Sequence, residues 1–306
     1  MNRCASVVLA AFLALAGSWA GLVLAPWAQL GRQVESKTVP EGEAYPPARP
    51  GLAVQGREVY RANGCASCHS QQVRQQGVRI GVAVVHAGTN VPGLVEAILR
   101  ASPRLSRDEA TRLVRQLPQA ILSDVPASEA RRVRRGLEAL GAEAVVTISP
   151  FGPDIERGWG KRRSVAADYL LDHPVMLGSQ RIGPDLANVG GRAVSREWLL
   201  THLYAPRSVV PGSLMPPYRY LFEKRRVRLA PSPEALRLPE VAQPGPGWEV
   251  VPKDEARALV AYLLSLNSSV SLYEAPLSPP PDSRVGQVAP VPTGGGPARP
   301  GIPPAP

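Results

Sequence analysis

Cysteine is scarce in this chain, with three residues in 306, and only four histidines and three methionines accompany them. Cys4 lies in an apolar run far from Cys65 and Cys68, so no second cysteine pair completes a four-ligand zinc site. No βαβ pattern surrounds the remaining pair, which argues against a thioredoxin-like redox motif. The sequence also lacks an evident nucleophile–base pair or a second cluster of metal ligands, so we do not expect an enzyme acting alone.

The two remaining cysteines belong to the segment Cys65-Ala66-Ser67-Cys68-His69. Cys-x-x-Cys-His is the attachment sequence of a c-type haem. Two thiols at this spacing add across the two vinyl groups of one haem, and the histidine that follows supplies a nitrogen ligand to the iron. The sequence therefore predicts one covalently attached haem c, bound by Cys65 and Cys68 with His69 on the iron.

A second axial ligand is expected from the few methionines. Met215 is followed by two prolines, which restrict the chain to an extended loop that could hold a thioether against a haem face. Met176 lies in a more apolar segment and is predicted to be a core residue. His/Met ligation raises the haem potential and leaves no open position for oxygen, which suits electron transfer. The histidines at 86, 173 and 202 are alternative ligands, more simply read as structural.

The net charge of +10 comes from 35 basic residues, of which 31 are arginine. They are scattered rather than run into blocks, and together with the haem motif this argues against nucleic acid as a partner. Arg181, Arg192 and Arg207 lie in the segment that holds Met215. Because a guanidinium binds a carboxylate with two hydrogen bonds, Arg181 and Arg192 are predicted to bind haem propionates.

Charge is absent from the N-terminus between Arg3 and Arg32. This stretch is long enough to cross a bilayer, which takes about 20 apolar residues. Trp19 and Trp27 are suited to the membrane interface. A cleaved signal peptide is the competing interpretation, with small residues near Ala14 or Ala20. The run continues past both positions, which favours a retained anchor.

Residues 31–50 have four prolines and few apolar side chains, and we expect a linker there. A short helix is expected over residues 54–63. Residues 78–150 follow, and their pattern of apolar residues predicts a small α+β unit. In order, its expected elements are a strand at 80–85, helices at 91–101, 106–117 and 126–140, and a strand at 144–148.

Beyond residue 165 the pattern predicts turns, a helix over 195–204, the Met215 loop and an irregular, proline-rich stretch over 223–252. A strongly amphipathic helix is expected over 254–267. The tail from Pro276 to Pro306 has eleven prolines and five glycines, so it cannot bury a core and is expected to be disordered.

Two ordered blocks of residues resemble the mono-haem subunit (subunit II) of cbb3-type cytochrome c oxidase. The first block is Gly56-Arg57-Glu58-Val59-Tyr60 followed by Gly64 to Gln71. The second block comprises Asp172-His173-Pro174, Gly178-Ser179, Arg181, Gly183-Pro184-Asp185-Leu186, Val189 to Arg192, Trp198, His202-Leu203, Pro206-Arg207, Val209-Val210-Pro211 and Ser213 to Tyr218. With the N-terminal anchor and the last helix, the resemblance covers about half the chain.

The resemblance implies a mainly α fold: a class I cytochrome c domain behind one N-terminal transmembrane helix, interrupted by the small α+β insert. Its expected parts are a transmembrane anchor (1–32), a linker (33–50), the cytochrome c domain in two pieces (51–77 and 151–272), the insert (78–150) and a disordered tail (273–306). The insert is similar to the C-terminal domain of the bacterial ribosomal stalk protein, but the turn by which that domain meets translation factors is missing. Its function is therefore not carried over, and a spacer or assembly surface is expected.

The expected function is non-catalytic: a membrane-anchored haem protein that passes electrons to the catalytic subunit of a haem–copper terminal oxidase. Expected partners are that subunit, other c-type cytochrome subunits and the lipid bilayer, with no nucleic acid. The expected location is the bacterial inner membrane, crossed once, with the haem domain on the periplasmic side. The alternatives are the mono-haem subunit of a nitric oxide reductase or another respiratory complex, and a free-standing haem sensor or carrier.

Overall fold

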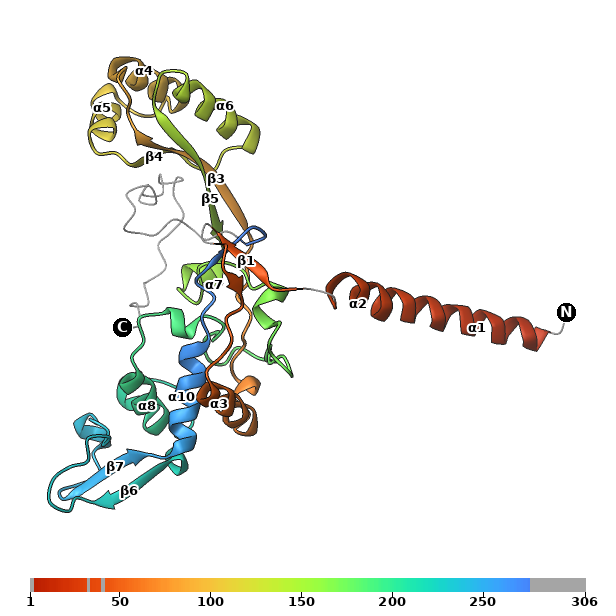
Figure 1. The fold of residues 1–306 in the computed structure, drawn as a ribbon, viewed down its shortest axis with the longest axis vertical. Helices are drawn as coiled ribbons and strands as arrows, with labels where there is room; N and C mark the ends of the chain where they lie inside the picture. Colours follow the sequence, from red (N-terminus) through yellow and green to blue (C-terminus); the bar gives the residue numbers. More distant parts are fainter. Residues whose placement is uncertain (1–2, 32–33, 40–41, 276–306) are drawn as a thin grey trace.

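The computed structural model describes residues 3–31, 34–39 and 42–275, and Figure 1 shows three parts along this chain. An isolated N-terminal helix leads to a main domain, which residues 42–76 and 152–275 build. An insert, residues 77–151, rises from that domain on a pair of strands. The tail expected to be disordered, from residue 276 onward, lies outside the described residues.

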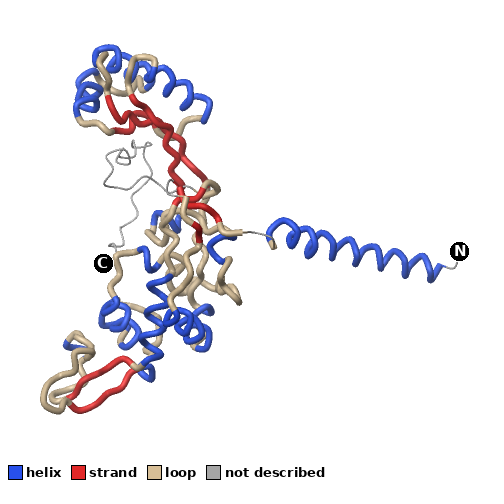
Figure 2. The backbone as a smooth tube through the Cα atoms, viewed as in Figure 1, coloured by secondary structure: helices blue, strands red, loops and turns tan. Residues whose placement is uncertain are grey.

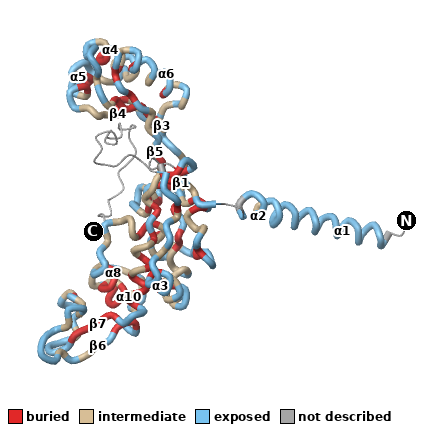
Figure 3. Tube along the Cα trace, viewed as in Figure 1, coloured by how far each residue is buried: buried red, intermediate tan, exposed pale blue. Residues whose placement is uncertain are grey.

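The N-terminal helix is one continuous rod with a π-helical turn. It consists of α1 (Arg3–Trp19), the π turn (Ala20–Leu24) and α2 (Ala25–Leu30). The π turn directly precedes Pro26, which lacks an N–H and whose ring interferes with regular i→i−4 bonding. Residues 4–29 are long and apolar enough to span a bilayer, and Figure 3 shows this helix exposed along its length.

The main domain is organised around two crossing helices, α3 (Gly51–Ala62) and α10 (Asp254–Ser265). They approach closely at Gly56, where an added Cβ would lie 1.8 Å from the carbonyl oxygen of Ala258. Tyr60 and Tyr262 pack edge to face next to this crossing, with ring centroids 5.3 Å apart. Because α3 ends just before the Cys-x-x-Cys-His segment, this packing fixes where that segment begins.

Short elements complete the main domain. Its helices α7 (Pro153–Glu156), α8 (Arg196–Tyr204) and α9 (Pro206–Val209) follow the insert. A small antiparallel sheet in the order β2-β1-β8 joins the start and the end of the described domain. Its strands are β1 (Ser36–Val39), β2 (Ala44–Tyr45) and β8 (Ser271–Leu272). The expected core residue Met176 is buried among α8, α10 and their neighbours.

The insert is an antiparallel sheet covered by three helices. The sheet has the order β4-β3-β5, with β3 (Gly77–His86), β4 (Gln119–Leu122) and β5 (Glu143–Phe151). The helices are α4 (Val91–Ala101), α5 (Arg107–Arg115) and α6 (Ala127–Glu138). They bury an apolar core of their own against the sheet. The expected helices and the two expected strands, β3 and β5, are present, whereas the edge strand β4 was not expected.

The prediction of irregular chain over residues 223–252 is confirmed for residues 227–247 and wrong at both ends. This region starts and ends in two strands, β6 (Phe222–Arg226) and β7 (Trp248–Pro252), which pair antiparallel over their whole length. Figure 2 shows them as a ribbon that projects from the end of the main domain away from the insert. The prolines of the region lie in the loop between the strands and at the last residue of β7, so they do not interrupt the pairing.

Candidate functional site

The Cys-x-x-Cys-His segment leaves α3 through a left-handed turn. Gly64 has a φ of 65°, which glycine adopts without strain, and a short 3-10 turn follows over Cys65–Ser67. The backbone N–H of His69 donates to the carbonyl of Cys65 at 3.0 Å, which closes one helical turn. Both thiols are free and partly buried, and burial raises the pKa of the Cys65 thiol to about 11. One turn thus carries both thiols and the imidazole.

His69 is held by a segment far along the chain. Its Nδ1 lies 2.9 Å from the carbonyl oxygen of Pro184, which assigns the N–H to Nδ1 and leaves Nε2 with a free lone pair. Gly183 lies against the ring, because an added Cβ would be 2.2 Å from Cε1 of His69. Burial lowers the pKa of His69, which favours the neutral imidazole that binds metals. The geometry fits an axial iron ligand.

Met215 lies in a loop that is tied to α8. The N–H of Tyr218 donates to the carbonyl of Leu203 at 2.8 Å, and the N–H of Met215 lies 3.3 Å from Oγ of Ser213. The Met215 side chain is partly buried and packs on the same core as the first cysteine of the motif. The partly buried apolar side chains packed against this core are Val59, Cys65, Ala66, Leu186, Val194, Trp198, Met215, Tyr218, Leu236, Ala242 and Leu264. A set of apolar side chains that brings the Cys65 thiol and the Met215 thioether to one core fits a haem.

Arg181 and Arg192, predicted to bind haem propionates, both have partners within the protein. Nη1 of Arg181 contacts Asp154 at 2.7 Å, and its Nη2 donates to the carbonyl of Gln72 at 2.5 Å. Nη2 of Arg192 donates to the carbonyl oxygens of Trp159, at 2.8 Å, and of Asp185. Propionate binding by either arginine stays a prediction, and the observed bonds assign both a part in holding the loops beside the motif.

Asp185 is the residue that sequence reasoning missed. It is fully buried and accepts hydrogen bonds from Oγ of Ser70 at 2.6 Å, from the N–H of Gln72 at 2.7 Å and from the N–H of Ala187 at 2.9 Å. The chain that follows His69 is thereby fixed to the chain that follows Pro184. A Gly-Pro-Asp-Leu turn carries no local signal for such a distant partner.

Among the alternative histidine ligands, His202 has the most distinctive setting. Its ring stacks on Trp198 with centroids 4.8 Å apart, and its Nδ1 is buried with no hydrogen-bond partner. Burial lowers the pKa of His202 to about 4, and the nearby His69 adds to the effect. By contrast, His86 is an exposed residue of the insert, 3.6 Å from Glu143, and His173 is exposed.

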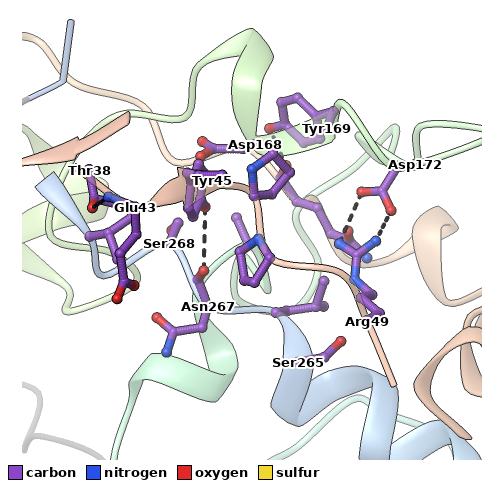
Figure 4. Close-up of a pocket in the computed structure, with 17 residues that line it drawn as sticks. Thr38, Glu43, Tyr45, Arg49, Asp168, Tyr169, Asp172, Ser265, Asn267 and Ser268 are labelled. Carbon is purple, nitrogen blue, oxygen red and sulfur yellow. Dashed lines mark hydrogen bonds and ion pairs between the residues drawn. The ribbon is translucent and has the colours of Figure 1, made fainter. Parts of the chain in front are cut away.

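The main domain also contains a cavity of about 190 Å³ (Figure 4). The segment that follows β1 lines it, together with residues around Tyr169 and the end of α10. Arg49 pairs with Asp172, and the Tyr45 hydroxyl lies 3.4 Å from the carbonyl of Asn267. These contacts fasten the linker to the domain, so we assign this cavity a structural role.

Comparison with known proteins identifies one family. Residues 145–243 match the family described as Cytochrome C oxidase, mono-heme subunit/FixO. No curated protein matches the chain. The matched segment contains Gly183, Pro184 and Met215 but not the Cys-x-x-Cys-His motif, which the fold brings against it through His69. The match supports the resemblance drawn from the sequence, and this segment of the chain is similar to the mono-haem subunit of cytochrome c oxidases.

Proposed function

We propose that this chain is a membrane-anchored mono-haem cytochrome c that passes electrons to the catalytic subunit of a haem–copper terminal oxidase. One observation carries the proposal: His69 of the haem motif donates to Pro184, inside the segment that matches the oxidase subunit family. The two halves of the haem site come from different sides of the insert, and the fold joins them. A chance Cys-x-x-Cys-His motif would have no reason to meet that segment.

The residues at the site have separate roles in this proposal. The thiols of Cys65 and Cys68 would hold the haem covalently, and Nε2 of His69 and the Met215 thioether would be the protein ligands of its iron. A haem so ligated supplies reversible one-electron chemistry at a raised potential. Because His69 and Met215 would both be ligands of the iron, the role proposed for the chain is that of a relay rather than a catalyst.

The side chains and backbone around the motif hold it rigidly, which favours rapid electron transfer. Asp185 holds Ser70 and Gln72, and Gly183 leaves just enough room for the imidazole. Backbone bonds add to this, since the N–H of Gly183 donates to Cys68 and that of Leu186 to Ser70. Because the ligand loop is tied at these points, the imidazole should move little when the iron changes charge.

The N-terminal helix is proposed to anchor the chain in the bacterial inner membrane, with the haem domain on the periplasmic side. The length and apolar composition of residues 4–29 support the anchor. Haem attachment to Cys-x-x-Cys-His takes place outside the cytoplasmic membrane in bacteria, which supports this sidedness. The catalytic oxidase subunit and other c-type cytochromes are the proposed partners.

The insert is proposed to be a spacer or an assembly surface. It has its own core and adds no ligand to the proposed haem site. Its likeness to the ribosomal stalk domain stays a prediction about fold. A nitric oxide reductase subunit or a haem sensor is the alternative function, and the match to the oxidase subunit family favours the oxidase.

Haem attachment is tested on the full chain, expressed with the cell's haem-attachment machinery. Wild-type protein should keep its haem on a denaturing gel and show a c-type pyridine haemochrome spectrum. The double variant Cys65→Ser/Cys68→Ser should lose both signals, whereas Cys4→Ser, the matched change at the remaining cysteine, should keep them. Haem that is released from wild type by denaturation would contradict covalent attachment.

A further inference from the structure

Basic side chains outnumber acidic ones in the segment that contains the Met215 loop. Residues 201–230 contain six basic and one acidic side chain, so this tenth of the chain carries half of its net charge of +10. The basic residues are Arg207, Arg219, Lys224, Arg225, Arg226 and Arg228. They lie in α9, in the turn after the Met215 loop, in β6 and just beyond the end of β6. The surface formed by Arg219, Lys224 and Arg226 is called the basic face below.

Most of these cations have no acidic partner. Among the described residues, Arg225 pairs with Glu249 at 2.7 Å, but Arg219, Lys224 and Arg226 form no ion pair. Lys224 and Arg226 instead lie over the Trp248 ring, with the Lys224 Nζ 5.0 Å and the Arg226 Cζ 5.2 Å from its centroid. This arrangement keeps two positive charges side by side on an exposed strand.

Arg219 and Lys224 also share a cavity. It has a volume of about 330 Å³ and is open to solvent, between β6 and the loop around Val241. The Arg219 guanidinium lies 5.3 Å from the centre of the Tyr204 ring, which supports it from one side. Two cations on the rim of one hollow are suited to a carboxylate side chain from another protein.

An apolar patch adjoins the cations. Leu214, directly before Met215, has 76% of its surface exposed, and Tyr220 has 59%. Exposed apolar side chains close in the chain to unpaired cations are suited to a brief protein encounter, in which charge steers the approach and apolar contact excludes water. Electron-transfer complexes bury small areas, below about 1,200 Å², so they do not need a large apolar surface.

The basic face is also remote from the linker. Figure 1 shows the β6–β7 ribbon at the far end of the main domain from β1, where the chain enters after the anchor helix. A partner that arrives from the aqueous phase can therefore reach it.

We infer that the basic face is the docking surface for a small, soluble, acidic electron-carrier protein, which exchanges electrons with the haem beside Met215. One electron passes between the carrier's reduced centre and the ferric haem, with no bond made or broken. This inference rests on the proposed function, because it needs the haem to be present.

The test is stopped-flow electron exchange between the purified full chain, with its haem, and plastocyanin, a small acidic copper protein. The test variant is Lys224→Glu/Arg226→Glu. Its control is Arg131→Glu/Arg135→Glu on α6 of the insert, which makes the same charge change at two exposed arginines. At low ionic strength the second-order rate constant should fall at least about tenfold in the test variant and less than about twofold in the control. The difference should vanish as salt screens the charges.

Equal rate constants for both variants, or a wild-type rate constant that does not change with salt, would overturn the inference. If the haem spectrum is normal in that case, the proposed function still stands. A test variant that exchanges electrons normally but no longer binds phosphatidylglycerol vesicles would also overturn it, in favour of a membrane contact. A chain without haem would overturn the proposed function and this inference together.

Discussion

Gly77 and Phe151 are paired neighbours on the two strands that lead into and out of the insert. The chain thus leaves the main domain and returns to it at one place. Just outside this pair, the N–H of Gln76 donates to the carbonyl of Phe151 at 2.9 Å, and Asp154 accepts from the N–H of Arg74 at 2.7 Å. The 75 residues of the insert therefore interrupt the sequence of the main domain without interrupting its packing.

Removing the insert should leave the haem site intact. Replacing residues 78–150 by Asn-Gly, which favours a two-residue hairpin turn, joins Gly77 to Phe151 where they already pair. The shortened chain should keep the haem spectrum and midpoint potential of wild type, measured by redox titration. A changed potential would show that the insert shapes the haem site, and loss of co-purifying subunits with an unchanged potential would support its role in assembly.

Gly183→Ala should disturb the proximal histidine. The added methyl group would lie 2.2 Å from Cε1 of His69, so the ring or the loop must move and the bond to Pro184 must weaken. We expect an altered haem spectrum and a loss of stability of about 1–3 kcal/mol, typical of overpacking. Gly136→Ala is the control, since its Cβ meets nothing within 4 Å and α6 gains a better helix former. A wild-type spectrum in Gly183→Ala would argue against His69 as the ligand.

Met215→Ala should lower the haem potential. Loss of the thioether would remove the proposed ligand, which favours the reduced iron, and a shift on the order of 0.1 V lies within the range of about 0.8 V that axial ligands span. Met176→Leu, a volume-conserving change at a buried methionine, should leave the potential where it is. Redox titration of both variants shows which methionine sets the potential. A lowered potential in Met176→Leu, with a wild-type potential in Met215→Ala, would assign the ligand to Met176.

Replacement of Asp185 by alanine should destabilise the fold, because three hydrogen bonds are lost together. In Asp185→Ala three donors, on Ser70, Gln72 and Ala187, lose their acceptor, at a site that is buried for Ser70 and partly buried for the other two. A buried unsatisfied group costs about 1–3 kcal/mol and a partly buried one less, so a loss of about 2–4 kcal/mol is expected in urea unfolding. Asp185→Asn should lose less, since its carbonyl still accepts. The exposed Glu240→Gln should be neutral, and equal losses at both positions would refute the network.

His202 should make the protein less stable in acid. Its pKa is lowered from 6.5 to about 4 by burial, so between these values the unfolded chain binds a proton that the folded chain does not. The free energy of unfolding should therefore fall as the pH drops from about 6.5 towards 4. Since solvent still reaches part of the ring, we expect a contribution of about 1–2 kcal/mol at pH 4.5. In His202→Gln the decline between pH 6.5 and 4.5, measured by urea unfolding, should be smaller by this amount. If the free energy of unfolding declines equally in His202→Gln and in wild type, a group other than His202 takes up the proton.

Local signals in the sequence predicted local structure well. The helix expected from residue 106 begins there with a capping box, in which Ser106 and Glu109 form both reciprocal hydrogen bonds. The amphipathic pattern also predicted the last helix, α10, whose observed end lies two residues before the expected one. These features depend on neighbours three or four positions away, which a sequence displays directly.

The missed features depend on distant partners. β4 is four residues long and is a strand because it pairs with β3. The pairing of β6 with β7 is hidden by the proline-rich loop between them. Asp185 and Arg181 meet residues more than a hundred positions away, around Ser70 and Gln72. For the same reason the sequence could name Arg181 as a cation near the haem segment but not its bond to Asp154.

The central claim is tested most directly by gentle purification of the tagged full chain from its source membranes, followed by haem analysis and oxygen-uptake measurement of what co-purifies. The account predicts a stable complex that contains c-type and b-type haem, a large membrane subunit with copper, and cyanide-sensitive oxygen uptake. A chain that purifies with c-type haem alone, without a large membrane subunit or oxygen uptake, would contradict the oxidase assignment and favour a free carrier or sensor.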